Sequence, residues 1–192
     1  MNSVAPIWDG NETWLVLGGV VLLAVFPVAF SIILPALYLP ITFMVMGLIF
    51  RGVAFEFRFK AHSSKWMWTA AFAGGSLLAT FFQGVVLGTF VQGFPVADGH
   101  YTGGAFHWIS PFSLMTGIAL VLGYGLLGAA WLVMKTEGPL QGWARDATLR
   151  LLLGVLFFMA IVSLWVPFLD REIADRWFTW PNTLWFAPVP IL

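Results

Sequence analysis

The stretch TWLVLGGVVLLAVFPVAFSIILPALYLPITFMVMGLIF, residues 13–50, decides the fold because it carries no charged side chain. A helix needs about 20 apolar residues to cross ~30 Å of hydrocarbon, so this stretch is too long for one crossing. Proline interrupts helices. Three prolines lie in the stretch: Pro27, Pro35 and Pro40. We therefore predict two membrane spans, about 11–32 and 36–57, joined by a tight turn near Pro35.

Four more uncharged stretches follow this one, at 66–97, 99–134, 151–169 and 177–192. They predict spans at about 66–91, 111–134 and 150–169, with a partial span from about 184. Only 9% of the residues are charged and 60% are hydrophobic, whereas a soluble domain carries about 25% charged residues. We predict an all-α integral membrane protein, in which 1–192 forms a single transmembrane helical domain. It has about five helices plus the start of another and is part of a larger helical bundle.

Composition excludes several functions. The net charge is zero and no basic patch exists, so we expect no nucleic-acid partner. The chain has no cysteine, which excludes disulfides, cysteine-ligated zinc and iron–sulfur clusters. Its three histidines lie in or beside predicted loops: His62, His100 and His107. We therefore expect no metal site and no haem ligation by this chain.

Loop charge predicts the orientation. Lysine and arginine gather in 51–65 and in 135–150, whereas 92–110 has neither. Cytoplasmic loops carry an excess of these residues. We therefore expect 1–10, 51–65 and 135–150 on the cytoplasmic side and 92–110 outside.

Glycines indicate where spans pack closely. Gly84 and Gly88 lie four residues apart on the third span, a spacing that lets two helices approach. Three glycines align in the same way on the fourth span: Gly123, Gly125 and Gly128. We expect close helix contacts at both places.

The segment WDGNETW, residues 8–14, leads directly into the first span. One interpretation is structural: Asp9 is an N-cap, and Glu12 three residues later completes a variant of the capping box. The other is functional: Asp9 accepts protons at the cytoplasmic mouth of a channel, since ionisable groups at membrane depth are candidate functional sites. The residues alone leave both open.

A second charged segment, RGVAFEFRFK at 51–60, ends the second span. It is either a helix end with mixed charge and basic anchors, or it holds a buried pair between Arg51 and Glu56. Such a pair at the membrane edge would tune a proton or quinone site. The spacing of five is not ideal for a helical pair, because positions four apart stack better.

These two segments carry a family resemblance. Residues 2–15, NSVAPIWDGNETWL, resemble the signature segment of subunit II of cytochrome bd-type quinol oxidases, including cyanide-insensitive members. RGVAFEFR, residues 51–58, resembles a second block of that family, with the same two spans between them. Pro111 and Phe112 also match the start of a family span. Compared with a usual subunit, the chain is expected to be truncated at both ends.

The resemblance implies a membrane enzyme complex that oxidises quinol and reduces dioxygen to water. Subunit I carries the haems, b and d, and the quinol site. Subunit II is the haem-free partner, with no catalysis expected alone. In the family, the position of Asp9 is where protons enter from the cytoplasm, and that of Trp14 lies near an oxygen route in some members. Arg51 and Glu56 are expected to support the proton site as a charge pair.

The resemblance further implies a bacterial cytoplasmic (inner) membrane protein in contact with lipid. Some members hold a structural quinone or a small single-span third subunit. The alternative to this interpretation is a small multi-span transporter or a structural membrane scaffold. Transporters usually carry polar or broken helices at the midplane. The midspan polar residues of this chain are uncharged serine, threonine and glutamine, such as Ser76, Thr80 and Gln83. Substrate uptake without a haem-bearing partner would favour the transporter.

Overall fold

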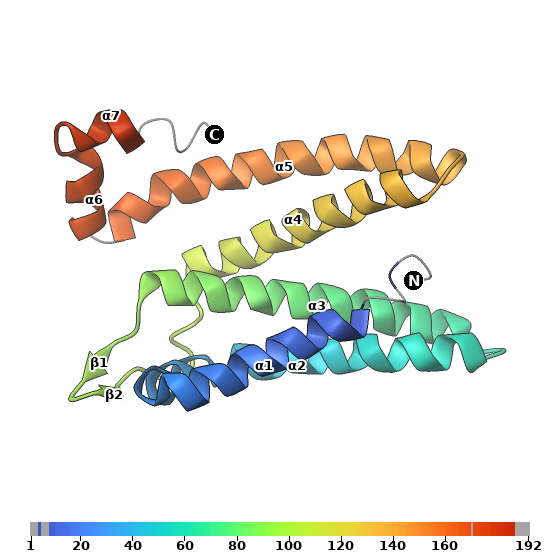
Figure 1. Cartoon of the computed structure of the whole chain (residues 1–192), viewed down its shortest axis with the longest axis horizontal. Helices are drawn as coiled ribbons and strands as arrows, with labels where there is room; N and C mark the ends of the chain where they lie inside the picture. The colour runs from blue at the N-terminus through green and yellow to red at the C-terminus, as the bar shows by residue number, and fades with distance from the viewer. Residues whose placement is uncertain (1–3, 5–7, 170, 187–192) are drawn as a thin grey trace. The chain divides into compact units, whose positions relative to one another are not determined.

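The computed structural model describes residues 4, 8–169 and 171–186. Most of them are helical (Figure 1). The elements are α1 Trp8–Val25, α2 Pro27–Lys60, α3 Lys65–Gln92, β1 Val96–Ala97, β2 His100–Tyr101, α4 Pro111–Lys135, α5 Pro139–Leu169, α6 Arg171–Phe178 and α7 Asn182–Phe186. Contacts divide the chain into two compact units, 1–121 and 122–192, with the boundary inside α4. The single domain predicted for 1–192 stays a prediction.

Four helices in the described part of the chain are long and apolar enough to cross a membrane: α2, α3, α4 and α5. The predicted fold class, an all-α membrane protein, is therefore confirmed. The helix α1 is 18 residues long and is not among these four. The number of spans, and with it the fifth span predicted at about 11–32, stays a prediction.

The predicted turn near Pro35 is wrong. The chain leaves helical geometry at Phe26, with φ −126° and ψ 59°, and α2 begins at Pro27. A residue before proline is disfavoured in the helical region, while proline itself suits the first helical position. Pro35 and Pro40 instead lie inside α2. Proline is tolerated inside membrane helices, where neighbouring groups satisfy the freed backbone.

The helices α2 and α3 pack closely because small residues face each other. An ideal Cβ on Gly47 would lie 2.7 Å from the carbonyl oxygen of Gly75. A Cβ on Gly75 would lie 2.6 Å from the carbonyl oxygen of Gly47. Side chains at both positions are therefore excluded by backbone atoms. Further along the same two helices, Leu37 and Val85 are buried in an apolar core with Ala36 and Trp108.

The close contact predicted at Gly84 and Gly88 is confirmed. A Cβ on Gly84 would lie 2.6 Å from the carbonyl oxygen of Thr116 on α4. The Thr116 hydroxyl donates a hydrogen bond to the Gly84 carbonyl at 2.9 Å. On α4, by contrast, a Cβ on Gly123 or Gly128 would meet nothing within 4 Å. On Gly125 it would meet the Leu151 side chain at 3.5 Å, an ordinary contact. Within the described part of this chain these three glycines make no close helix contact, so a glycine-mediated approach on α4 stays a prediction.

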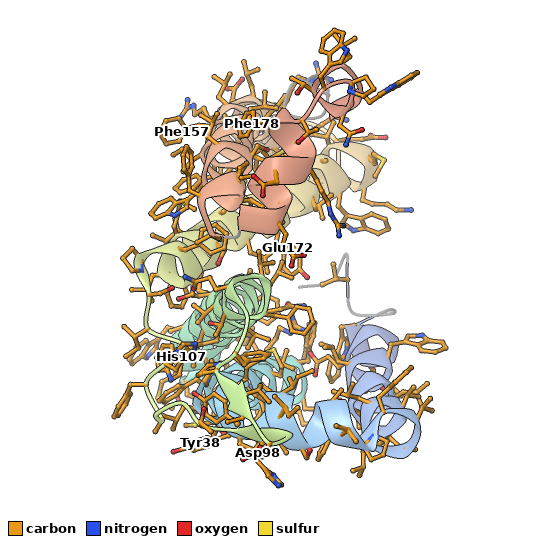
Figure 2. The ribbon with its side chains drawn as sticks, turned by 90° about the vertical axis from the view of Figure 1, so that its left-hand side faces the viewer. Tyr38, Asp98, His107, Phe157, Glu172 and Phe178 are labelled. Carbon is orange, nitrogen blue, oxygen red and sulfur yellow. The ribbon has the colours of Figure 1, made fainter. Side chains whose placement is uncertain are left out.

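A short antiparallel hairpin, β1 and β2, lies between α3 and α4. Its turn is Asp98-Gly99, and both residues have positive φ, 51° and 75°. Asp-Gly is a typical sequence of two-residue hairpin turns because both positions need that conformation. Figure 2 shows Asp98, Tyr38 of α2 and His107 at this end of the first unit. We predict only a loop for 92–110 from its lack of lysine and arginine, although the Asp98-Gly99 dipeptide indicates the hairpin.

The second unit contains the end of α4 and the helices α5 to α7. A Cβ on Gly154 of α5 would lie 3.3 Å from the side chain of Leu122, so the two helices are in contact. Gln141 Nε2 of α5 donates a hydrogen bond to the Val133 carbonyl of α4 at 3.0 Å. The helix α6 contacts both α5 and α7.

Candidate functional site

The start of α1 and the end of α2 are joined by an ion pair between Glu12 and Arg51. Arg51 Nε and Nη2 both donate to Glu12 Oε1, at 2.9 and 2.5 Å. The side chains are only 18% exposed for Glu12 and 26% for Arg51. The charges are therefore largely withdrawn from solvent, and each satisfies the other.

An aromatic stack lies beside this ion pair. The Trp8 ring stacks on Phe55 with centroids 4.7 Å apart and planes 10° from parallel. Phe55 is only 4% exposed and meets the edge of Phe72 on α3 at 5.1 Å. A Cβ on Gly52 would lie 3.5 Å from the Trp8 ring, an ordinary van der Waals contact that places the indole against this part of α2. Stack and ion pair together fix the beginning of α1 on α2.

Asp9 lies inside the first turn of α1, so the predicted N-cap role is wrong. The Glu12 carboxylate binds Arg51 and does not complete a capping box. The Asp9 backbone carbonyl accepts a hydrogen bond from Thr13 Oγ1 at 3.0 Å. Within the described residues, the exposed Asp9 carboxylate has no hydrogen-bond or ion-pair partner.

The predicted pair between Arg51 and Glu56 does not form. Glu56 instead accepts from Lys60 Nζ at 3.4 Å, with side chains 67% and 77% exposed. Five residues on a helix correspond to about 140° of rotation, so Arg51 and Glu56 point to different sides. Lys60, four residues after Glu56, is on the same side. An exposed pair of this kind contributes little to stability.

Trp14 also lies on α1, and its side chain is 72% exposed. No stacking partner for it occurs in the described part of the chain. The structure brings Trp14 together with Asp9 on one helix but not with Glu56. The oxygen-access role stays a prediction.

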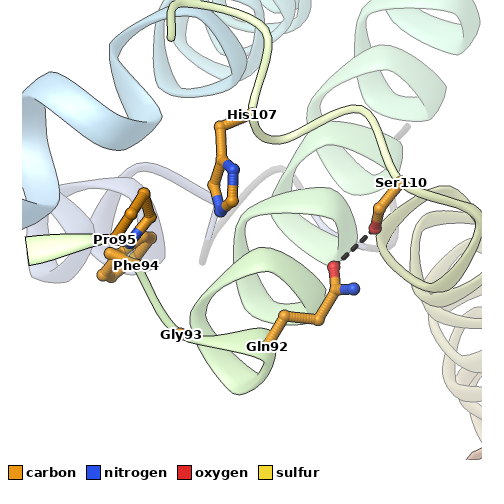
Figure 3. A pocket seen from close by; sticks show the side chains of 6 residues that line it. All are labelled: Gln92, Gly93, Phe94, Pro95, His107 and Ser110. Atoms are coloured by element: carbon orange, nitrogen blue, oxygen red, sulfur yellow. Dashed lines mark hydrogen bonds between the residues drawn. The ribbon is translucent and has the colours of Figure 1, made fainter. Parts of the chain in front are cut away.

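The far end of the first unit holds a cavity of about 400 Å³ (Figure 3). Its lining is Gln92, Gly93, Phe94, Pro95, His107 and Ser110. The Ser110 hydroxyl donates to Gln92 Oε1 at 2.5 Å, linking the end of α3 to the start of α4. No group of three His, Asp or Glu side chains that could hold a metal ion occurs in this cavity or elsewhere among the described residues.

Beside the cavity, Tyr101 anchors the loop after the hairpin. Its hydroxyl donates to the Gly104 carbonyl at 2.9 Å, and its ring lies 6.3 Å from that of His107. Burial raises the pKa of the Tyr101 phenol above its usual value of 10.0. Folding therefore favours the neutral phenol. The resulting contribution to the free energy of unfolding is fully present below the unfolded pKa of about 10 and is lost as the pH rises through the higher pKa of the folded state.

Replacing Ser113 by alanine should loosen this end of the unit. The Ser113 side chain is fully buried, donates to the Trp108 carbonyl at 2.5 Å and accepts from the Ser110 backbone N–H at 3.1 Å. Leaving buried partners unpaired costs about 1–3 kcal/mol. At about 2–4 °C for each kcal/mol in a chain of this size, we expect Ser113→Ala to lower the midpoint of heat denaturation by about 2–12 °C. A thermal ramp on the purified protein checks this.

Ser76→Ala is the matched control, because the Ser76 hydroxyl bonds only the Phe72 carbonyl of its own helix. It should leave the midpoint unchanged. Equal midpoints for Ser113→Ala and the unchanged protein would contradict the assigned role of the Ser113 hydroxyl.

Sequence comparisons show the family of the chain. All of 1–192 matches the family described as cytochrome bd terminal oxidase subunit II. Cytochrome bd-I ubiquinol oxidase subunit 2 of Escherichia coli strain K12 is 31% identical over 175 residues, 88% of this chain and 46% of the relative. Cytochrome bd ubiquinol oxidase subunit 2 of Bacillus subtilis strain 168 is 33% identical over 160 residues, 82% and 47%.

A third relative, the probable cytochrome oxidase subunit 2 of Haemophilus influenzae, is 30% identical over 174 residues, 86% of this chain and 46% of the relative. The chain thus spans about half the length of the curated relatives it matches.

Proposed function

Because this chain belongs to the cytochrome bd terminal oxidase subunit II family, we propose that it serves as the haem-free subunit of a membrane quinol oxidase. The complex would oxidise quinol and reduce dioxygen to water. Haems b and d would be held by a partner, subunit I, with which this multi-pass membrane chain assembles. The positions of the histidines support this division: His62 follows α2, while His100 and His107 lie in the hairpin and the loop after it.

We infer that Asp9 takes up protons for oxygen reduction. This inference rests on the Asp9 carboxylate, which is exposed and has no partner among the described residues. The neighbouring acid one turn later, Glu12, is instead bound in an ion pair with Arg51. A carboxylate in this position can bind a proton from water and release it again. Glu56 is not part of this proposal, because its carboxylate binds the exposed Lys60.

The proposed side of uptake is the cytoplasm. The start of α1 lies against the end of α2 (Figure 1), so Asp9 is at the same end as the basic segment 51–65. The excess of lysine and arginine there favours a cytoplasmic location. Protons consumed from this side charge the membrane, and each elementary charge moved stores about 2.3 kcal/mol per 100 mV.

Trp14 is proposed to face an oxygen route. Its exposed indole on the same helix supports this, because a large apolar side chain facing lipid or a partner subunit borders the phase in which oxygen is most soluble. The transporter alternative gains no support from the midspan residues. The Ser76 hydroxyl, for example, is satisfied by its own helix.

Co-purification tests the subunit assignment. The tagged chain should be purified from its native membrane and a reduced-minus-oxidised absorption spectrum recorded. We expect haem bands in a stoichiometric amount, contributed by the partner. The same preparation from cells that carry the tag on an unrelated membrane protein provides the blank. A colourless preparation, or substrate uptake by the chain without a haem-bearing partner, would contradict the assignment.

A further inference from the structure

The pair between Glu12 and Arg51 links two helices that are otherwise loosely associated. The partners are 39 residues apart in the sequence, one in the first turns of α1 and the other in the last third of α2. Both donating nitrogens of Arg51 meet the same carboxylate oxygen. The pair therefore fixes the position of one helix against the other. The exposed pair of Glu56 and Lys60 cannot do this, because both side chains belong to α2.

The remainder of α1 offers little to hold it in place. Gly18 and Gly19 have nothing within 4 Å of an ideal Cβ. Val16 and Val20 are exposed. Among the described side chains, the first turns of α1 are held to α2 by the stack of Trp8 on Phe55 and by the ion pair of Glu12 with Arg51.

Asp9 lies between these two contacts. It follows Trp8 directly and precedes Glu12 by three residues, so it shares a side of the helix with Glu12. A rotation or a slide of α1 would move the Asp9 carboxylate, and both motions are resisted by the contacts on either side of it. Displacements of about 1 Å at a reacting group lower rates by up to ~10².

We propose that Glu12 and Arg51 are a positioning pair that holds Asp9 at the mouth of the proton path. This inference rests on the proposed function of Asp9 and extends it to a residue, Glu12, that lies outside the charge pair expected from the sequence. Neither Glu12 nor Arg51 carries the proton in this account. Their effect on turnover is transmitted through Asp9.

A double-mutant cycle in the assembled oxidase tests the proposal. Arg51→Gln should lower quinol-driven oxygen consumption about tenfold while the haem spectrum is retained. In an Asp9→Asn background, Arg51→Gln should lower turnover no further, because interacting residues are not additive. Exchanging the charges, Glu12→Arg with Arg51→Glu, should restore turnover to within about threefold of the unchanged enzyme.

Lys60→Gln is the matched control. It removes a basic side chain from the same helix end but breaks only the exposed pair with Glu56. Its turnover should equal that of the unchanged enzyme.

Two results would overturn the inference. One is full turnover in Arg51→Gln. The other is a loss that multiplies with the loss from Asp9→Asn, which is what a purely structural pair would give. If Arg51→Gln fails to retain haem, Glu12→Gln is measured in its place. The inference is supported if Glu12→Gln lowers turnover in the unchanged enzyme but not in the Asp9→Asn background. Unchanged turnover in Glu12→Gln would overturn it. Full turnover in Asp9→Asn would instead overturn the proposed function of Asp9 itself.

Discussion

Replacing Gly88 by leucine is expected to reduce the assembled oxidase in membranes at least about tenfold. An ideal Cβ at this position would lie 2.0 Å from Thr116 Oγ1 and 2.8 Å from the Cα of Ser113. Thr116 could rotate away, but the Ser113 Cα is backbone and can yield only if α4 moves. Overpacking typically costs 1–3 kcal/mol and more where the backbone must shift. The haem content per milligram of membrane protein measures the assembled complex.

Gly74→Leu is the matched control for this variant. Gly74 lies on the same helix, and a Cβ there would meet nothing within 4 Å. Leucine at this position should leave the haem content unchanged. Normal haem content in Gly88→Leu would contradict the α3–α4 contact described above.

Asp9→Asn is expected to lower oxygen consumption about tenfold or more at an unchanged haem content. Asparagine keeps the size and the hydrogen-bonding capacity of the side chain but cannot bind and release a proton near neutral pH. Proton transfer by a positioned side chain typically contributes 10²–10⁴-fold to a rate. Quinol-driven oxygen consumption per haem is the measurement.

Asp98→Asn provides the control at the opposite end of the first unit. Asp98 has φ 51° in the hairpin turn, a conformation that asparagine also adopts readily. Turnover should not change. Equal turnover of Asp9→Asn and Asp98→Asn would remove the basis for proton uptake at Asp9.

The helices were predictable from the sequence because uncharged runs of this length have few other stable states in a membrane. The error at Pro35 shows the limit of that argument. Pro27 begins α2, while Pro35 and Pro40 lie within it. All three are prolines in one apolar run, so the sequence does not distinguish Pro27, which follows a helix break, from the two inside α2, which packs against α3. Ala36 and Leu37, directly after Pro35, are buried in that contact.

The candidate site was only half predictable. Asp9 and Arg51 were both recognisable as ionisable residues at the ends of apolar runs. The partner of Arg51 was not, because Glu12 is 39 residues away and Glu56 is only five. A pairing between helices depends on their rotation about their own axes, which charge spacing along one helix does not specify. The stack of Trp8 on Phe55 fixes how α1 is rotated about its own axis relative to α2.

Proton uptake during a single turnover tests the central claim most directly. The oxidase is reconstituted in vesicles in one orientation and reduced, and a pulse of oxygen is given while a pH-sensitive dye reports from one side of the membrane. We expect uptake from the side on which Asp9 and 51–65 lie, slowed about tenfold or more by Asp9→Asn. Uptake from the side of the β1–β2 hairpin, or an unchanged rate in Asp9→Asn, would contradict it.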